Sequence, residues 1–123
     1  MAQEYMIFIM ERVSDFDDFT PEQEQELGER HGRFVKYIED AGGAVLDGGP
    51  LEKPSAGNRF IPQPDGSVLA TDGPFAESKE VVLGYYKIRA ESDEQARDFA
   101  EHCPTARYVD LHKLLPVGAS VAN

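Results

Sequence analysis

The sequence has only one cysteine and no tryptophan among its 123 residues. A lone cysteine, Cys103, excludes an internal disulfide and any metal site built from several cysteines. No stretch approaches the roughly 20 apolar residues that a membrane-spanning helix needs, and the first residues lack the basic segment of a secretory signal. We therefore expect a cytoplasmic protein that has no membrane partner.

Positive charge is also scarce, because 12 lysines and arginines stand against 23 aspartates and glutamates, for a net charge of −11. Such a field repels phosphate backbones, so nucleic acid is not an expected partner. The sequence contains no HExxH pattern, no cysteine cluster and no pair of histidines at helical ligand spacing, which argues against a metal site. It also lacks a GxGxxG or P-loop pattern, so we expect no cofactor.

The size and composition fit one domain with a sizeable core, since 41% of the residues are hydrophobic. We expect this single domain to span residues 1–116 and residues 117–123 to form a flexible tail. No repeat with a period of 20–50 residues is visible.

The first half of the chain predicts a strand, a helix and a short strand. Residues 5–10 form an apolar run typical of a central strand covered on both faces, followed by an acidic loop at 14–18. Thr20, Pro21 and Gln23 form a capping box that starts a helix, and glycines at 42 and 43 end it. Residues 44–46 predict a short strand closed by residues 47–50, with an irregular surface loop at 51–57.

The second half predicts a hairpin, a strand, a helix and a last strand. Residues 58–61 and 67–71 flank a Pro-Asp-Gly turn at 64–66, which is typical of a tight hairpin. Residues 81–90 are rich in β-branched and aromatic residues. Ser92 starts a second helix that ends before Pro104, and residues 107–115 alternate well enough for a strand.

This order of elements indicates the α+β class. Both helices would cover one face of a mostly antiparallel sheet. Two helices cannot also cover the opposite face, so that face needs another partner. The simplest partner is the same sheet of a second copy, and we therefore predict a homodimer.

The sequence TDGPFAESKE at residues 71–80, followed by LGYY at 83–86, resembles the signature of the DGPF branch of the YciI-related family. The resemblance extends over nearly the whole chain. It implies a ferredoxin-like βαββαβ fold with an inserted β-hairpin, assembled as a dimeric α+β barrel. Relatives on this barrel include muconolactone isomerase-like enzymes, and some DGPF members are encoded beside or fused to sigma factors of the extracytoplasmic-function class.

The resemblance also implies a site. Shorter members of the family are suspected to pair a histidine of the first helix with an aspartate just before the proline that ends the second. His31 matches the histidine, but Cys103 stands where the aspartate would precede Pro104. In this branch we expect Asp72, which the signature supplies at a strand end, to be the carboxylate.

Each of these two residues has a structural alternative. His31 has the side chain whose pKa best suits proton transfer near neutral pH, but a histidine on an apolar helix stripe is often a core residue. Asp72 could orient His31 or act as a base, but Asp-Gly is also a common turn pair.

Four further residues are candidates for binding a substrate: Arg59, Lys79, Glu80 and Tyr85. Each also has a structural interpretation, as solvated surface for the charged residues and as strand packing for the tyrosine. Lys79 and Glu80 would point to opposite faces if they lay in a strand. We expect Cys103 to be a small buried hydrophobe, and His102 and His112 to be structural.

Two functions follow as hypotheses. The first is a cofactor-independent small-molecule enzyme of isomerase or lyase type, in which His31 and Asp72 perform acid–base chemistry. The alternative is a non-catalytic binding or regulatory module that contacts a regulatory protein in sigma-factor-dependent transcription.

Overall fold

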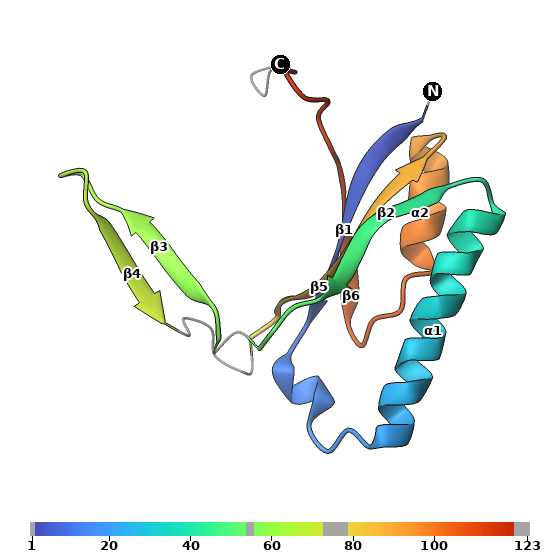
Figure 1. Ribbon diagram of the computed structural model, residues 1–123, viewed down its shortest axis with the longest axis horizontal. Coiled ribbons are helices and arrows are strands. Elements are labelled where there is room, and N and C mark those ends of the chain that lie inside the picture. The colour runs from blue at the N-terminus through green and yellow to red at the C-terminus, as the bar shows by residue number, and fades with distance from the viewer. Residues whose placement is uncertain (1, 54–55, 73–78, 120–123) are drawn as a thin grey trace.

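The computed structural model describes residues 2–53, 56–72 and 79–119, and it has two helices beside a four-stranded sheet, with a separate hairpin (Figure 1). The elements in chain order are β1 (Gln3–Glu11), the 3-10 turn η1 (Val13–Phe16), α1 (Pro21–Asp40), β2 (Ala44–Pro50), β3 (Asn58–Pro62), β4 (Val68–Asp72), β5 (Val81–Ala90), α2 (Asp93–Glu101) and β6 (Tyr108–Lys113).

The main sheet has the strand order β2-β5-β1-β6, and all three pairings are antiparallel. Both helices lie on one face of this sheet, as the sequence predicted (Figure 1). The α+β class is therefore confirmed.

The central strand β1 alternates strictly between its two faces. Tyr5, Ile7 and Ile9 are buried toward the helices, whereas Met6 and Phe8 on the other face are only partly buried. Within one chain the helices thus cover one face of β1, and coverage of its other face by a second copy stays a prediction.

Both helices begin where their capping residues predicted. The Thr20 hydroxyl accepts a hydrogen bond from the Gln23 amide (3.1 Å), and the Gln23 side chain accepts one from the Thr20 amide (2.8 Å). Gly42 follows α1 with a φ of 87°, a left-handed conformation that favours glycine. At the start of α2, the Ser92 hydroxyl accepts from the Gln95 amide at 3.0 Å.

The core forms between the helices and the sheet. Its fully buried members include Ile7 and Ile88 from the strands, Ile38 from α1 and Phe99 from α2. Cys103 is also buried, and this burial raises the pKa of its thiol to about 12. The prediction that Cys103 is a buried hydrophobe is confirmed, since a thiol with such a pKa stays protonated and unreactive.

Two local predictions were wrong. Strand β2 does not end at residue 46 but continues to Pro50, because its glycines let it pack closely on β5: a Cβ at Gly48 would lie 2.7 Å from the Tyr86 ring. The acidic segment at 14–18 is not simply a loop, since it includes part of η1. Lys79 and Glu80 lie just before β5, so the condition under which they would point to opposite faces of a strand is not met.

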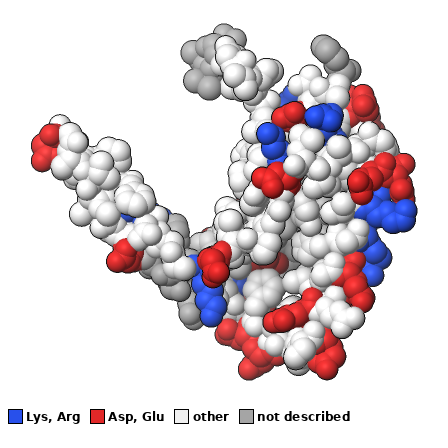
Figure 2. All heavy atoms as spheres, viewed as in Figure 1, with Lys and Arg blue, Asp and Glu red and all other residues white. Residues whose placement is uncertain are grey.

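The hairpin β3–β4 stands apart from the main sheet (Figure 1). Its turn carries Gly66 at a φ of 90°, as the Pro-Asp-Gly sequence predicted. Both faces of this hairpin expose apolar side chains, with Phe60 and Val68 on one face and Ile61 and Leu69 on the other. Figure 2 shows its surface as largely uncharged, whereas acidic side chains gather near the start of α1.

Across the part of the chain that the structure describes, neither helix is long and apolar enough to cross a membrane.

Candidate functional site

A cavity of about 540 Å³ lies between the first half of α1, η1 and the adjoining ends of β1, β2 and β5. Most of its wall is apolar, and the side chains that supply this wall are Ile9, Val13, Phe16, Phe19, Leu27, Leu51, Leu83, Tyr85 and Tyr86. Its volume falls within the range of about 300–1,000 Å³ typical of small-molecule sites. The four ionisable side chains other than tyrosine that line it are Glu11, Glu24, His31 and Lys53.

His31 reaches the cavity from α1 and is half-buried. Its Nδ1 lies 2.6 Å from the Tyr86 hydroxyl, which projects from β5 toward the helices. Burial lowers the pKa of His31, and the charge of neighbouring Arg30 lowers it further, so the imidazole is neutral over a wider pH range. Burial raises the pKa of Tyr86 to about 12, so its phenol keeps its proton.

Glu11 lies at the end of β1 and is only 8% exposed, the one charged residue so buried among those that the structure describes. Its Oε2 accepts a hydrogen bond from the Ala106 amide at 2.7 Å. Burial raises the pKa of Glu11, and the charge of Asp15 adds to this effect, whereas the hydrogen bond from Ala106 opposes it. Glu11 and His31 therefore bring two ionisable groups to one largely apolar cavity.

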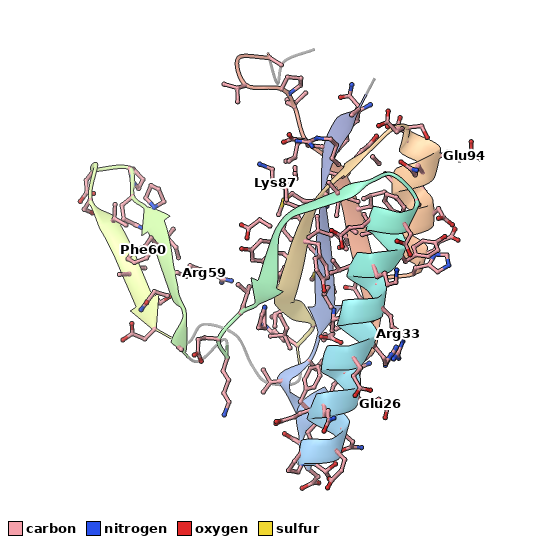
Figure 3. The ribbon with its side chains drawn as sticks, turned by 45° about the vertical axis from the view of Figure 1, so that its right-hand side comes forward. Glu26, Arg33, Arg59, Phe60, Lys87 and Glu94 are labelled. Carbon is pink, nitrogen blue, oxygen red and sulfur yellow. The ribbon has the colours of Figure 1, made fainter. Side chains whose placement is uncertain are left out.

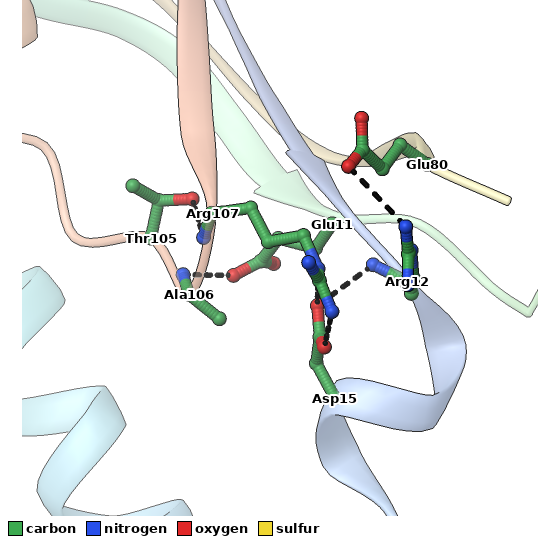
Figure 4. A network of polar contacts seen from close by, with 7 residues as sticks. All are labelled: Glu11, Arg12, Asp15, Glu80, Thr105, Ala106 and Arg107. Atoms are coloured by element: carbon green, nitrogen blue, oxygen red, sulfur yellow. Dashed lines mark hydrogen bonds and ion pairs between the residues drawn. The ribbon is translucent and has the colours of Figure 1, made fainter. Parts of the chain in front are cut away.

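A cluster of polar contacts holds the wall of the cavity beside Glu11 (Figure 4). Arg107 donates from Nε (2.9 Å) and Nη2 (2.8 Å) to the two carboxylate oxygens of Asp15, and the Arg12 amide donates to the same carboxylate at 2.9 Å. These bonds lower the pKa of Asp15, with the Arg107 hydrogen bonds as the largest cause. They join η1, which supplies Val13 and Phe16 to the cavity, to the segment before β6.

The comparison with known families identifies the family of this chain. A family model described as the YCII-related domain matches residues 4–116. The chain belongs to the YCII-related family.

A second similarity is local. Over 41 residues the chain is 46% identical to an uncharacterized protein of Rhizobium meliloti, and this alignment covers 33% of each of the two chains. The match thus spans about a third of the length of that curated relative. Neither the family description nor the relative's name specifies a reaction.

The structure of this YCII-related protein separates the predicted site residues into groups. Tyr85 lines the same cavity as His31, and its hydroxyl donates to Asp47 at 3.1 Å. Arg59, Lys79 and Glu80 instead line a second hollow of about 730 Å³. Figure 3 shows the Arg59 side chain extending from the hairpin toward the main sheet.

Asp72 lies at the end of β4 in the hairpin, where its carboxylate accepts a hydrogen bond from the Asn58 side chain. It is not among the residues that line the cavity beside His31. The pairing of His31 with Asp72 therefore stays a prediction. Of the DGPF signature, residues 73–78 lie outside the described residues.

Sequence reasoning missed Glu11 and the contact of His31 with Tyr86. The signal for Glu11 was the alternation of β1, which places residue 11 on the same buried face as Ile7 and Ile9. Tyr86 follows from the same rule along β5, where Ile88 and Ala90 mark the helix-facing side.

No group of three or more histidine, cysteine, aspartate or glutamate side chains suited to a metal ion occurs within the described ranges.

Proposed function

We propose that this YCII-related protein is a cofactor-independent enzyme of isomerase or lyase type, in which His31 takes part in acid–base chemistry on a small molecule. The observation that carries the proposal is the His31–Tyr86 hydrogen bond at the wall of the 540 Å³ cavity. An apolar cavity with few polar groups is the usual form of a small-molecule site.

The contact with Tyr86 also favours one form of His31. Because Tyr86 keeps its proton, we infer that its O–H donates to Nδ1, which places the imidazole proton on Nε2. Nε2–H is then the group that His31 presents to a ligand. A neutral imidazole in this form acts as a hydrogen-bond donor at a carbonyl or hydroxyl oxygen.

An NMR titration of the three histidines, combined with a screen of neutral metabolites, tests this function. We expect His31 to titrate below the ordinary pKa of about 6.5, because its charged form loses solvation in the half-buried site. Compounds that bind the cavity should shift the ring signals of His31 and leave those of His112 on β6 unchanged. An ordinary titration together with no responding compound would exclude this enzyme.

The Tyr86→Phe variant is the matched control, because it removes one hydroxyl and keeps the ring. Ring ¹⁵N shifts should show the Nε2–H form in the wild type and a mixture of both tautomers in the variant. Unchanged ¹⁵N shifts would show that Tyr86 does not set the tautomer.

We also propose that the protein is a homodimer with a ferredoxin-like, dimeric α+β barrel fold, formed by residues 1–116 and located in the cytoplasm. The strand order β2-β5-β1-β6 supports this fold, because it places the first and third strands of a βαββαβ unit at the centre. The open face of the sheet supports the dimer. Met6, Phe8 and Met10 form a partly buried apolar row there, beside the ion pair of Glu4 with Lys87 at 3.5 Å.

Sedimentation equilibrium should give the mass of two chains for the wild type. A Phe8→Glu variant should shift this mass toward one chain, because two carboxylates would be brought together at the centre of a symmetric interface. Its circular dichroism should still show both helices. A wild-type mass of one chain would refute the dimer.

The exposed hairpin favours a second candidate function, that of a module that binds a regulatory protein. Phe60 is 66% exposed, and apolar side chains occupy both faces of a two-stranded unit. Isolated hairpins of this kind have little stability of their own, so a binding partner would stabilise the unit. A screen in which no compound enters the cavity would favour this function over the enzyme.

A further inference from the structure

We propose that Glu11 is the base of this site and that its substrate is a compact, neutral carbonyl compound with an acidic C–H bond beside the carbonyl. This inference rests on the proposed function and adds to it a catalytic residue and a substrate class. It departs from the expectation that Asp72 supplies the carboxylate.

The position of Glu11 supports this role. It reaches the cavity from the end of β1, whereas His31 reaches it from α1, so a molecule in the cavity has one group on the sheet side and one on the helix side. The other two charged side chains of the wall, Glu24 and Lys53, are exposed to solvent. Apart from the tyrosines, Glu11 and His31 are thus the two ionisable groups of the wall that are not exposed to solvent.

The acid–base properties of Glu11 and His31 also support this role. Burial raises the pKa of Glu11, which makes its carboxylate a stronger base than an exposed one. Burial lowers the pKa of His31, which keeps the imidazole neutral. A strengthened carboxylate base and a neutral imidazole donor in the wall of one cavity form a pair suited to removing a proton next to a carbonyl.

The step balances without a further reactant. The Glu11 carboxylate takes the proton from the carbon beside the carbonyl, and the electrons of that C–H bond form a C=C bond. The carbonyl π electrons move to oxygen, where His31 Nε2–H donates a hydrogen bond to the developing charge. When the Glu11 carboxyl first exchanges this proton for a deuteron from the solvent D₂O, its return to the same carbon gives exchange. Return of the proton or deuteron to a conjugated carbon gives an isomer.

The apolar wall sets the class of substrate. A charged molecule would lose its hydration against side chains such as Phe16, Leu27 and Leu83. The charged side chains Glu24 and Lys53 of the wall are exposed to solvent, where an ion pair offsets little of that cost. A neutral ring system with one carbonyl oxygen loses little hydration and gains apolar contact. We therefore choose 2-tetralone, a bicyclic ketone with acidic C–H bonds, as the probe.

The experiment follows exchange of the 2-tetralone C1 protons for deuterium by ¹H NMR in D₂O. The wild type should exchange them at least 10-fold faster than buffer. Glu11→Gln should lower the enzymatic rate by about 100-fold or more, as expected for loss of a general base, and His31→Gln should also lower it. The matched control is Glu26→Gln, which changes an exposed carboxylate on α1, labelled in Figure 3, and should keep the wild-type rate.

If Glu11 had a purely structural role, Glu11→Gln would lose stability together with its exchange rate. Thermal unfolding of the variant tests this alternative. The glutamine side-chain oxygen can still accept the Ala106 hydrogen bond, so Glu11→Gln should unfold at the wild-type temperature or above it. Glu11→Asp keeps a carboxylate but shortens its reach, and should retain a measurable fraction of the exchange rate.

The possible outcomes separate the inference from the proposed function. Loss of exchange in both Glu11→Gln and His31→Gln, with a folded Glu11→Gln protein, would support the inference. Exchange that needs His31 and persists in Glu11→Gln would overturn it and leave the proposed function standing. Binding of 2-tetralone, seen as shifted His31 signals, without exchange above buffer would overturn the carbonyl chemistry. Absence of both binding and exchange would overturn the substrate class.

Discussion

Phe99→Ala is expected to lower the free energy of unfolding by about 3–5 kcal/mol, the range typical of truncating a buried phenylalanine. Phe99 has no exposed surface and lies in the core between α2 and the sheet. Its ring also meets Tyr37 of α1 edge-on, with 6.1 Å between ring centroids. Truncation would remove this aromatic contact and leave a cavity that the two helices and the sheet cannot fully close.

Urea unfolding followed by circular dichroism would measure this loss. Leu115→Ala is the control, because Leu115 is 55% exposed and follows the last strand. We expect the control to change the free energy of unfolding by less than about 0.5 kcal/mol, as is usual for surface substitutions. Equal effects of the two substitutions would show that Phe99 does not occupy the core.

Gly43→Ala should destabilise the protein by about 1–3 kcal/mol, the usual range for overpacking a closely packed site. A Cβ at Gly43 would lie 2.6 Å from Cε2 of Phe99 and 2.9 Å from the carbonyl oxygen of Arg89. The ring could turn away, but the carbonyl belongs to the backbone of β5, so the strand itself would have to move. Chemical denaturation at one protein concentration would measure the effect.

The control for Gly43→Ala is Gly32→Ala, which also adds one methyl group to a glycine. Gly32 lies within α1, and a Cβ there would meet no atom within 4 Å. Because alanine favours helix over glycine, we expect Gly32→Ala to raise stability by about 0.5–1 kcal/mol. The same sign of effect for both variants would contradict the close approach of Gly43 to Phe99.

Local signals in the sequence predicted most of the fold because each rests on a short-range interaction. The capping box at Thr20 and the N-cap serine at Ser92 marked the helix starts, and the turn at Gly66 marked the hairpin. Signals that depend on distant neighbours were less informative. The extension of β2 to Pro50 depends on its pairing with β5, which the glycines at 48 and 49 do not reveal.

The candidate site shows the same limit. His31 stood out because histidine titrates near neutral pH, and Tyr85 because it follows the signature. Glu11 was marked only by the alternation of β1, because its residue type is usually exposed and nothing in the sequence shows that a cavity forms at the end of β1. The sequence also does not indicate that Asp72 lies in a hairpin apart from the main sheet, because that separation is a tertiary property.

The burial of Cys103 gives the molecule a practical advantage for spectroscopy. With this thiol buried and protonated, maleimide dyes or spin labels would react selectively at a cysteine introduced on the surface. Since the sequence also lacks tryptophan, one tryptophan placed at Phe16 would report on the cavity without background emission from another indole. Ligand entry and hairpin position could therefore be followed in one protein with two independent optical reporters.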